Sequence, residues 1–92
     1  MKQKTAIIIE VYEKIESENT INNSITTRVE VYTDYADGYG FGTVCILPNI
    51  TPKTISTLLS TIGSLSNDGF EIKVKYIEKS KYNDTAVKNL LH

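Results

Sequence analysis

The sequence has few of the residues from which catalytic and metal sites are built. Its single histidine, His92, is the last residue, where a side chain is seldom held in a fixed geometry. A Ser–His or Cys–His nucleophile pair is therefore not expected, because the base of such a pair must be positioned. The single cysteine, Cys45, excludes an intramolecular disulfide and a zinc site made of cysteine pairs. We expect a protein that is not an enzyme, with no catalytic residue, no metal and no cofactor.

Long apolar runs are also missing from the chain. The run that follows Lys2 and Lys4 covers only residues 6–9, which is too short for a signal-peptide core or a membrane span. A lone cysteine without a secretion signal favours a reducing, cytoplasmic location and no contact with a membrane. The length predicts a single domain over residues 1–92, with a core too small to give a wide margin of stability.

Charge of one sign is not in excess, since the formal net charge is −1. The chain-wide basic surplus that usually accompanies phosphate binding is therefore absent. The charges are unevenly placed, with acids predominating in residues 10–37 and lysines in residues 73–92. This asymmetry indicates either an acidic strand beside a basic one or a surface for an oppositely charged partner.

The most informative segment that is present spans residues 29–46 and predicts an antiparallel hairpin. Asp37-Gly38 suits the two central positions of a type I′ turn, because Gly favours positive φ and Asp tolerates it. The resulting register places Val31 opposite Val44 and Val29 opposite Ile46. Both faces are then partly apolar, which is unusual for a small sheet with one wet side. One face would carry Val29, Val31, Val44 and Ile46, and the other Tyr32, Phe41, Cys45 and Leu47.

Residue patterns elsewhere predict the remaining elements. Alternating apolar residues favour strands over 5–15, 25–34, 39–47 and 70–76. Thr51 as cap and Pro52 at the first helical position begin a helix over 52–66 with an apolar stripe. Asn83 or Asp84 is expected to cap a short last helix. If Ile15 lies near Ile25, the first strand places Ile9 opposite Val31 and Val11 opposite Val29, on the same apolar face.

These elements predict an α+β fold in the order strand–strand–strand–helix–strand–helix. The sheet is expected to be four-stranded and mainly antiparallel, with the main helix packed on the face of Val29 and Val31. Lysines 73 and 75 would lie beside Glu10 and Glu13 if the fourth strand paired with the first. We therefore favour the spatial strand order 3-2-1-4, and the order 1-2-3-4 stays open.

The segment Gly38-Tyr39-Gly40-Phe41 resembles the core of the RNP1 signature of RNA-recognition-motif domains. The strand–helix–strand that follows is similar to that family's order, and the resemblance covers about half of the chain. It implies that Tyr39 and Phe41 stack on bases of a single strand, as the family's strand aromatics do. Asp37, Gly42 and Val44 depart from the signature, and no helix is expected between the first two strands.

The lack of catalytic groups and the second apolar sheet face favour a non-catalytic interaction protein. The partner would be another protein or a second copy in a homodimer, and nucleic acid is the alternative. In size and composition the chain is typical of small phage and mobile-element proteins that inhibit host factors by binding them. Ile8 would share this second face. The residues predicted to bind the partner are Tyr32, Phe41, Tyr39, Tyr12 and Leu47.

Overall fold

The computed structural model describes residues 4–15, 23–34 and 40–92 and has the predicted α+β architecture. Its four strands form one sheet in the order β3-β2-β1-β4, so the favoured strand order is confirmed. The turn predicted at Asp37-Gly38 lies outside the described residues. The elements are β1 (Thr5–Lys14), β2 (Ser24–Asp34), β3 (Phe41–Leu47), α1 (Pro52–Asn67), β4 (Glu71–Glu78), a 3-10 turn (Lys79–Lys81) and α2 (Asp84–Leu91).

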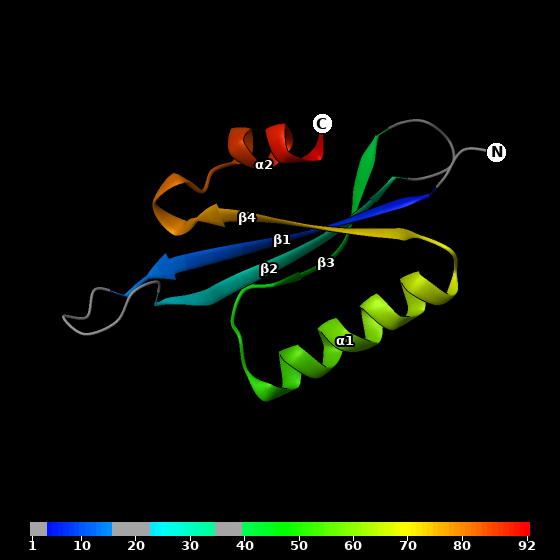
Figure 1. The fold of residues 1–92 in the computed structure, drawn as a ribbon, viewed down its shortest axis with the longest axis horizontal. Helices are drawn as coiled ribbons and strands as arrows, with labels where there is room; N and C mark the ends of the chain where they lie inside the picture. Colours follow the sequence, from blue (N-terminus) through cyan, green and yellow to red (C-terminus); the bar gives the residue numbers. More distant parts are fainter. Residues whose placement is uncertain (1–3, 16–22, 35–39) are drawn as a thin grey trace.

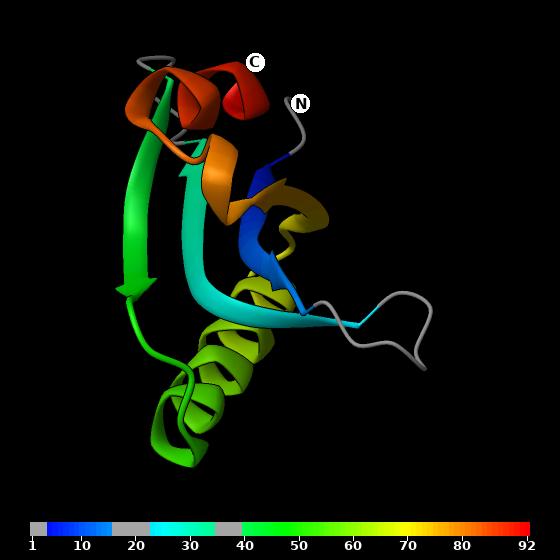
Figure 2. The same ribbon diagram turned by 90° about the vertical axis from the view of Figure 1, so that its left-hand side faces the viewer.

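The sheet lies between the two helices, with α1 on one face and α2 on the other (Figure 1). It is mixed, because β2 runs antiparallel to both β1 and β3 whereas β4 runs parallel to β1. The strands β3 and β4 therefore run in the same direction at opposite edges of the sheet, so the connection between them must cross the sheet, and α1 lies within it. Seen from the side, β3 and β4 are the two edges of the sheet (Figure 2).

The predicted pairing of β1 with β2 is wrong by one residue in the centre of the sheet. Val31 lies opposite Ile8 rather than Ile9, and Ile9 lies opposite Glu30. The prediction started from a contact between Ile15 and Ile25, but the backbone N–H of Ile15 donates to the carbonyl of Asn23 at 2.8 Å. A β-bulge between Val11 and Tyr12 then shifts the register again.

A slip of one residue moves every side chain of a strand to the other face of the sheet. Ile7 and Ile9 consequently lie on the α2 side, where they form a core cluster with Val87. Ile8, which we expected on the second face, lies instead in the α1-side core.

The predicted pairing of β2 with β3 holds only near the turn. Tyr32 lies opposite Thr43 as expected, but a register shift between Val31 and Tyr32 brings Cys45 opposite Val31. The extra residue is Val44, and beyond it the faces of β3 are exchanged. The sequence pattern does not reveal this bulge, because both faces of the strand carry apolar side chains.

The helix α1 forms where the cap signals place it and covers the α1-side core. The Thr51 side chain accepts the backbone N–H of Thr54, whose own side chain accepts the N–H of Thr51, and Pro52 occupies the first turn. Gly69, with φ +87°, provides the left-handed turn into β4. The buried residues of this core are Ala6, Ile8, Val29, Val31, Leu47 and Leu65, with Leu58 and Ile62 partly buried against them.

Ile9→Ala is expected to lower the free energy of unfolding by about 2–5 kcal/mol, because truncation of a buried isoleucine leaves a cavity. Ile25→Ala is the matched control, because Ile25 is 50% exposed and Ile9 is 0% exposed. Urea unfolding of the two variants beside the wild type measures both values. Equal losses would contradict the observed register, which buries Ile9 at the centre of the sheet.

Candidate functional site

The second face of the sheet, predicted to bind a partner, is covered in large part by α2. Asn83 caps this helix by accepting the backbone N–H of Ala86 at 2.8 Å. Its apolar side then rests on the sheet, with Val87 buried and Leu90 and Leu91 partly buried against the cluster of Ile7 and Ile9. The Lys75 ammonium donates to the backbone carbonyl of Leu90, which ties the end of the helix to β4.

The structure brings together two of the five residues predicted to bind a partner. Tyr32 and Phe41 are both partly buried in the α2-side cluster. Leu47 was expected on this face, but the bulge in β3 places it in the α1-side core, where it is buried. Tyr12 lies near the far end of β1, beside Ile15 and outside both core clusters. Tyr39 lies outside the described residues, so its prediction stays open.

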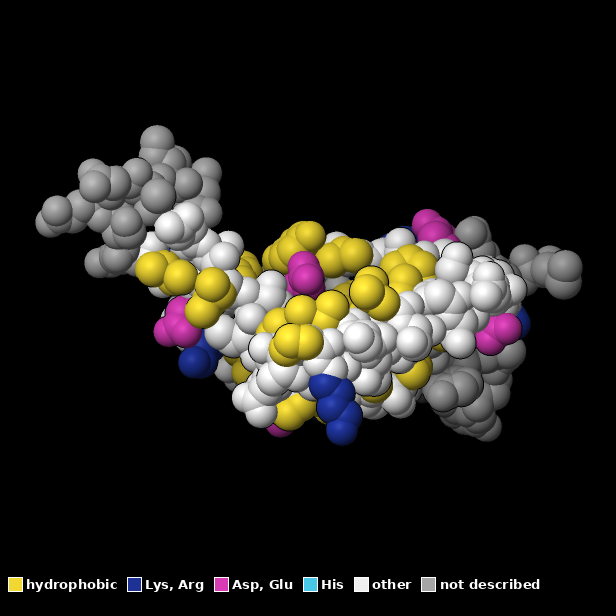
Figure 3. Space-filling view, turned by 90° about the horizontal axis from the view of Figure 1, so that it is seen from below, with side chains coloured by type: hydrophobic (Ala, Val, Ile, Leu, Met, Phe, Trp, Pro, Cys, Tyr) yellow, Lys and Arg dark blue, Asp and Glu magenta, His cyan; other side chains and the backbone are white. Residues whose placement is uncertain are grey.

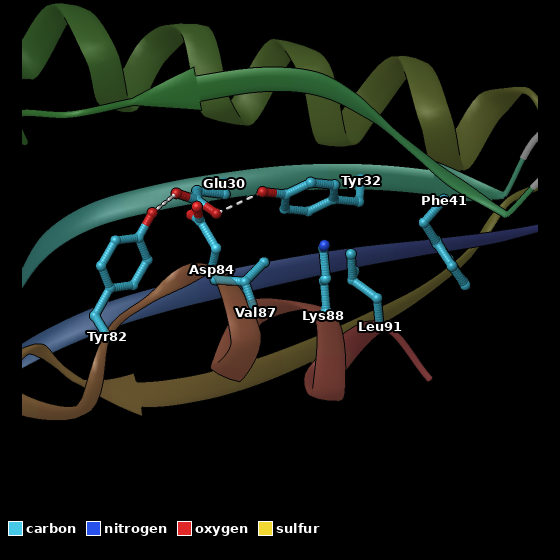
Figure 4. A pocket seen from close by; sticks show the side chains of 8 residues that line it. All are labelled: Glu30, Tyr32, Phe41, Tyr82, Asp84, Val87, Lys88 and Leu91. Atoms are coloured by element: carbon cyan, nitrogen blue, oxygen red, sulfur yellow. Dashed lines mark hydrogen bonds between the residues drawn. The ribbon is translucent and has the colours of Figure 1, made fainter.

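A buried carboxylate lies at the centre of the contact between β2 and the α2 segment. Glu30 is 1% exposed and accepts three hydrogen bonds, so its charge is fully compensated. The Tyr32 hydroxyl donates to Oε1 at 2.6 Å, and the Arg28 Nε donates to Oε2 at 2.6 Å. The Tyr82 hydroxyl donates to the same Oε2 from the segment before α2. Figure 4 shows the two tyrosines pointing at Glu30 from opposite sides.

The hydrogen bonds determine the protonation state of this cluster. Burial by itself would raise the pKa of Glu30, but the bonds from Tyr32, Tyr82 and Arg28 outweigh it and hold that pKa below its ordinary value. Burial, reinforced by the bond to Glu30, raises the pKa values of both tyrosines. The Arg28 guanidinium also lies 5.5 Å from the centre of the Tyr82 ring, within cation–π range. Glu30 is therefore a charged group that holds its three donors in place, and it is not a base ready to accept a proton.

A pocket of about 310 Å³ lies beside this cluster, between the sheet and α2 (Figure 4). Glu30, Tyr32 and Phe41 line it from the sheet, and Val87, Lys88 and Leu91 line it from α2. The side chains combine an apolar wall with the compensated carboxylate of Glu30 and the charges of Asp84 and Lys88, and none of the described residues that line the pocket is a cysteine, serine or histidine. The contacts around the pocket hold α2 in place on the sheet. The ring of Phe41 packs here against the α2-side cluster instead of standing free on an open sheet face.

Sequence patterns do not single out Glu30, Arg28 and Tyr82 as members of one site. Glu30 is one of several acids in residues 10–37, and the predicted register gives no reason to bury it. A signal was nonetheless present: Arg28, Glu30 and Tyr32 alternate along one strand and so share one face. Tyr82 is 52 residues away from Glu30 in the chain, and only the folded topology brings them together.

Apolar side chains are left uncovered on the opposite side of the molecule, where α1 lies. The view from below shows them gathered over α1 and the neighbouring part of the sheet (Figure 3). The large exposed hydrophobic residues of these elements are Ile55 and Leu59 of α1 and Val74 and Tyr76 of β4. We call these four residues the α1–β4 apolar patch.

Two further findings limit what the described residues can do. In residues 4–15, 23–34 and 40–92, no group of three or more His, Cys, Asp or Glu side chains could hold a metal ion. Over the same residues, neither helix combines the length and the apolar character needed to cross a membrane.

Comparisons with protein-family models, with curated proteins and with solved structures found no match to this chain.

Tyr82→Phe is expected to lower the free energy of unfolding by about 1.5–3 kcal/mol, because it removes a hydrogen bond to a buried charged group. The ring and its contact with Arg28 are retained in this variant. Tyr76→Phe is the matched control, since Tyr76 is exposed, and its effect is expected to stay within about 0.5 kcal/mol. Urea unfolding compares the two, and equal effects would show that the Glu30 cluster does not stabilise the fold.

The stability contributed by Glu30 is expected to depend on pH in the acidic range. Because its folded pKa is depressed, the contribution is complete above the unfolded pKa of about 4.3 and is lost as pH falls through the folded pKa. Glu30→Gln cannot titrate at this position. The difference in unfolding free energy between the wild type and Glu30→Gln should therefore shrink as the pH is lowered, and a constant difference would contradict an ionised Glu30.

Proposed function

We propose that this protein is a non-catalytic binding domain that contacts another protein, or a second copy of itself, through the α1–β4 apolar patch. The observation that carries the proposal is the exposure of large apolar side chains at this surface: Leu59 is 64% exposed and Tyr76 is 62% exposed. Isolated apolar side chains on a surface are normal, whereas contiguous apolar patches usually mark sites of contact.

The four residues belong to one surface by the geometry of their elements. Ile55 and Leu59 are one helical turn apart, so their side chains lie on the same side of α1. Val74 and Tyr76 point to the same side of β4 as Ile72, which packs against the α1-side core. The two pairs therefore flank the junction of helix and sheet (Figure 3).

The composition around the patch suits a close approach by another protein surface. Residues 54–67, nearly the whole of α1, carry no charge, so little desolvation of charged groups opposes contact. Tyr76 supplies an aromatic ring, a residue type enriched in interfaces. Glu10 lies opposite Tyr76 on β1 and is partly exposed, which provides a polar group beside the patch.

This proposal keeps the predicted class of function and moves the binding surface. The face of Tyr32 and Phe41 was expected to be open because one main helix can cover only one face. The second helix, α2, covers much of it. The exposed apolar area lies instead on the other face, which α1 covers only in part. Leu65 is the one residue of this helix that is buried.

Leu59→Glu and Tyr76→Glu are each expected to weaken partner binding by about tenfold to a hundredfold, because a buried leucine side chain contributes about 1.5–3 kcal/mol. The matched control is Thr57→Glu, which adds the same charge to an exposed position about half a turn around α1. The tagged wild type and the three variants are cross-linked in extracts of the producing cells, and self-association is measured on the purified proteins.

A species that is captured or formed by the wild type and by Thr57→Glu, but by neither patch variant, supports the proposal. If the patch variants behave like the wild type in both measurements, the patch is not the binding surface. Far-ultraviolet circular dichroism of each variant checks that the loss does not come from unfolding.

A further inference from the structure

The second feature that points to a partner is the outer edge of β3. In the described sheet β3 has β2 as its neighbour on one side and no strand on the other. In Figure 2 β3 forms the left side of the sheet; α2 lies across its upper end, and no helix runs along the lower part of the strand. Every second residue of an edge strand directs its backbone N–H and C=O outward, where another strand can pair with them.

The two edges of the sheet differ in how well they are protected against pairing. The other edge, β4, carries charged side chains at Glu71, Lys73, Lys75 and Glu78, a common device that blocks the approach of another strand. The edge strand β3 (Phe41–Leu47) has the sequence FGTVCIL and carries no charge. It is therefore the edge that can accept a partner without burying unpaired charges.

Two apolar side chains of β3 lie in neither core cluster and are uncovered. Val44 and Ile46 are exposed although both are β-branched and apolar. Ile46 lies opposite Glu30, so it is on the α2 side of the sheet. The α2-side core cluster includes Phe41 from β3 but not these two residues.

We propose that β3 pairs antiparallel with β3 of a second copy of this chain, forming a two-fold dimer whose sheet is continuous across the interface. This interface is distinct from the α1–β4 apolar patch, because β3 and β4 are opposite edges of the sheet. The inference therefore does not depend on the surface assigned above.

A second copy fits this edge for reasons of charge and symmetry. In a two-fold antiparallel pair each side chain near the axis meets its own kind, and like charges in that position are destabilising. An uncharged strand avoids this penalty. A strand of strong charge from another protein would gain no ion pair from β3. Pairing also closes the assembly at two copies, since the charged β4 edges are then the outer edges of the joined sheet.

The test measures the mass of the purified wild type in solution by sedimentation equilibrium and light scattering over a range of concentrations. Ile46→Lys is expected to raise the dimer dissociation constant about tenfold or more, because it places one ammonium group from each copy in the pairing of two otherwise uncharged strands. Ile25→Lys is the matched control: it adds the same charge to an exposed apolar position of β2, outside β3 and outside the α1–β4 apolar patch. It should leave the dimer intact.

A readout in the unmodified protein keeps the test independent of how the variants fold. Amide hydrogen exchange of β3 should slow as the protein concentration rises, because pairing protects the outward N–H groups. Thr43→Lys, at another exposed position of β3, provides a second variant and should act like Ile46→Lys.

Other outcomes overturn the inference. A wild type that stays monomeric at every concentration excludes the β3 dimer. A dimer that survives Ile46→Lys and Thr43→Lys but is lost in Val74→Lys and Leu59→Glu would assign self-association to the α1–β4 apolar patch, which supports the proposed function and refutes the pairing of β3. Partner binding that survives Leu59→Glu and Tyr76→Glu, together with an intact β3 dimer, would refute the proposed function alone.

Discussion

The position of the C-terminal segment on the sheet depends on the buried, ionised carboxylate of Glu30. A charge removed from water is tolerated only when donors surround it, and here they come from β2 and from Tyr82, just before α2. Because these hydrogen bonds require both segments to be in place, they fix where the C-terminal part of the chain lies. The apolar contacts of Val87, Leu90 and Leu91 then complete the cover over that face.

The two β-bulges determine which surfaces remain for partners. The bulge in β3 turns Leu47 into the α1-side core and leaves Val44 and Ile46 exposed at an uncharged edge. The shift near Tyr12 separates the central part of β1 from its far end, where Ile15 and Ile25 are exposed. Apolar side chains outnumber the core positions that two short helices can cover. The surplus lies at β3 and over α1 and β4.

Local signals in the sequence were sufficient for the elements and their order. Thr51 and Pro52 begin α1 as predicted, Asn83 caps α2, and the alternation in β4 gives a half-buried strand. The prediction that β4 pairs with β1 is correct, but its reason is wrong: Lys73 and Lys75 lie opposite Ile7 and Ile9, not beside Glu10 and Glu13. The helix and strand predictions succeed because caps and periodicity depend on residues that are close in the chain.

By itself, then, the amino-acid sequence determined the α+β class, the order of the elements along the chain and the face that α1 covers, because each follows from local periodicity and capping. It favoured the spatial strand order 3-2-1-4 but left 1-2-3-4 open, and the tertiary structure decided between them. Only the tertiary structure decided which side of the sheet each apolar residue of β1 and β3 takes. A strand with apolar residues at both odd and even positions gives no preference between two registers. A bulge of one residue then exchanges the two faces of the strand beyond it. The Glu30 cluster required the same tertiary information, since its Tyr82 donor comes from a segment distant in the chain and reaches it only after the sheet and α2 have packed.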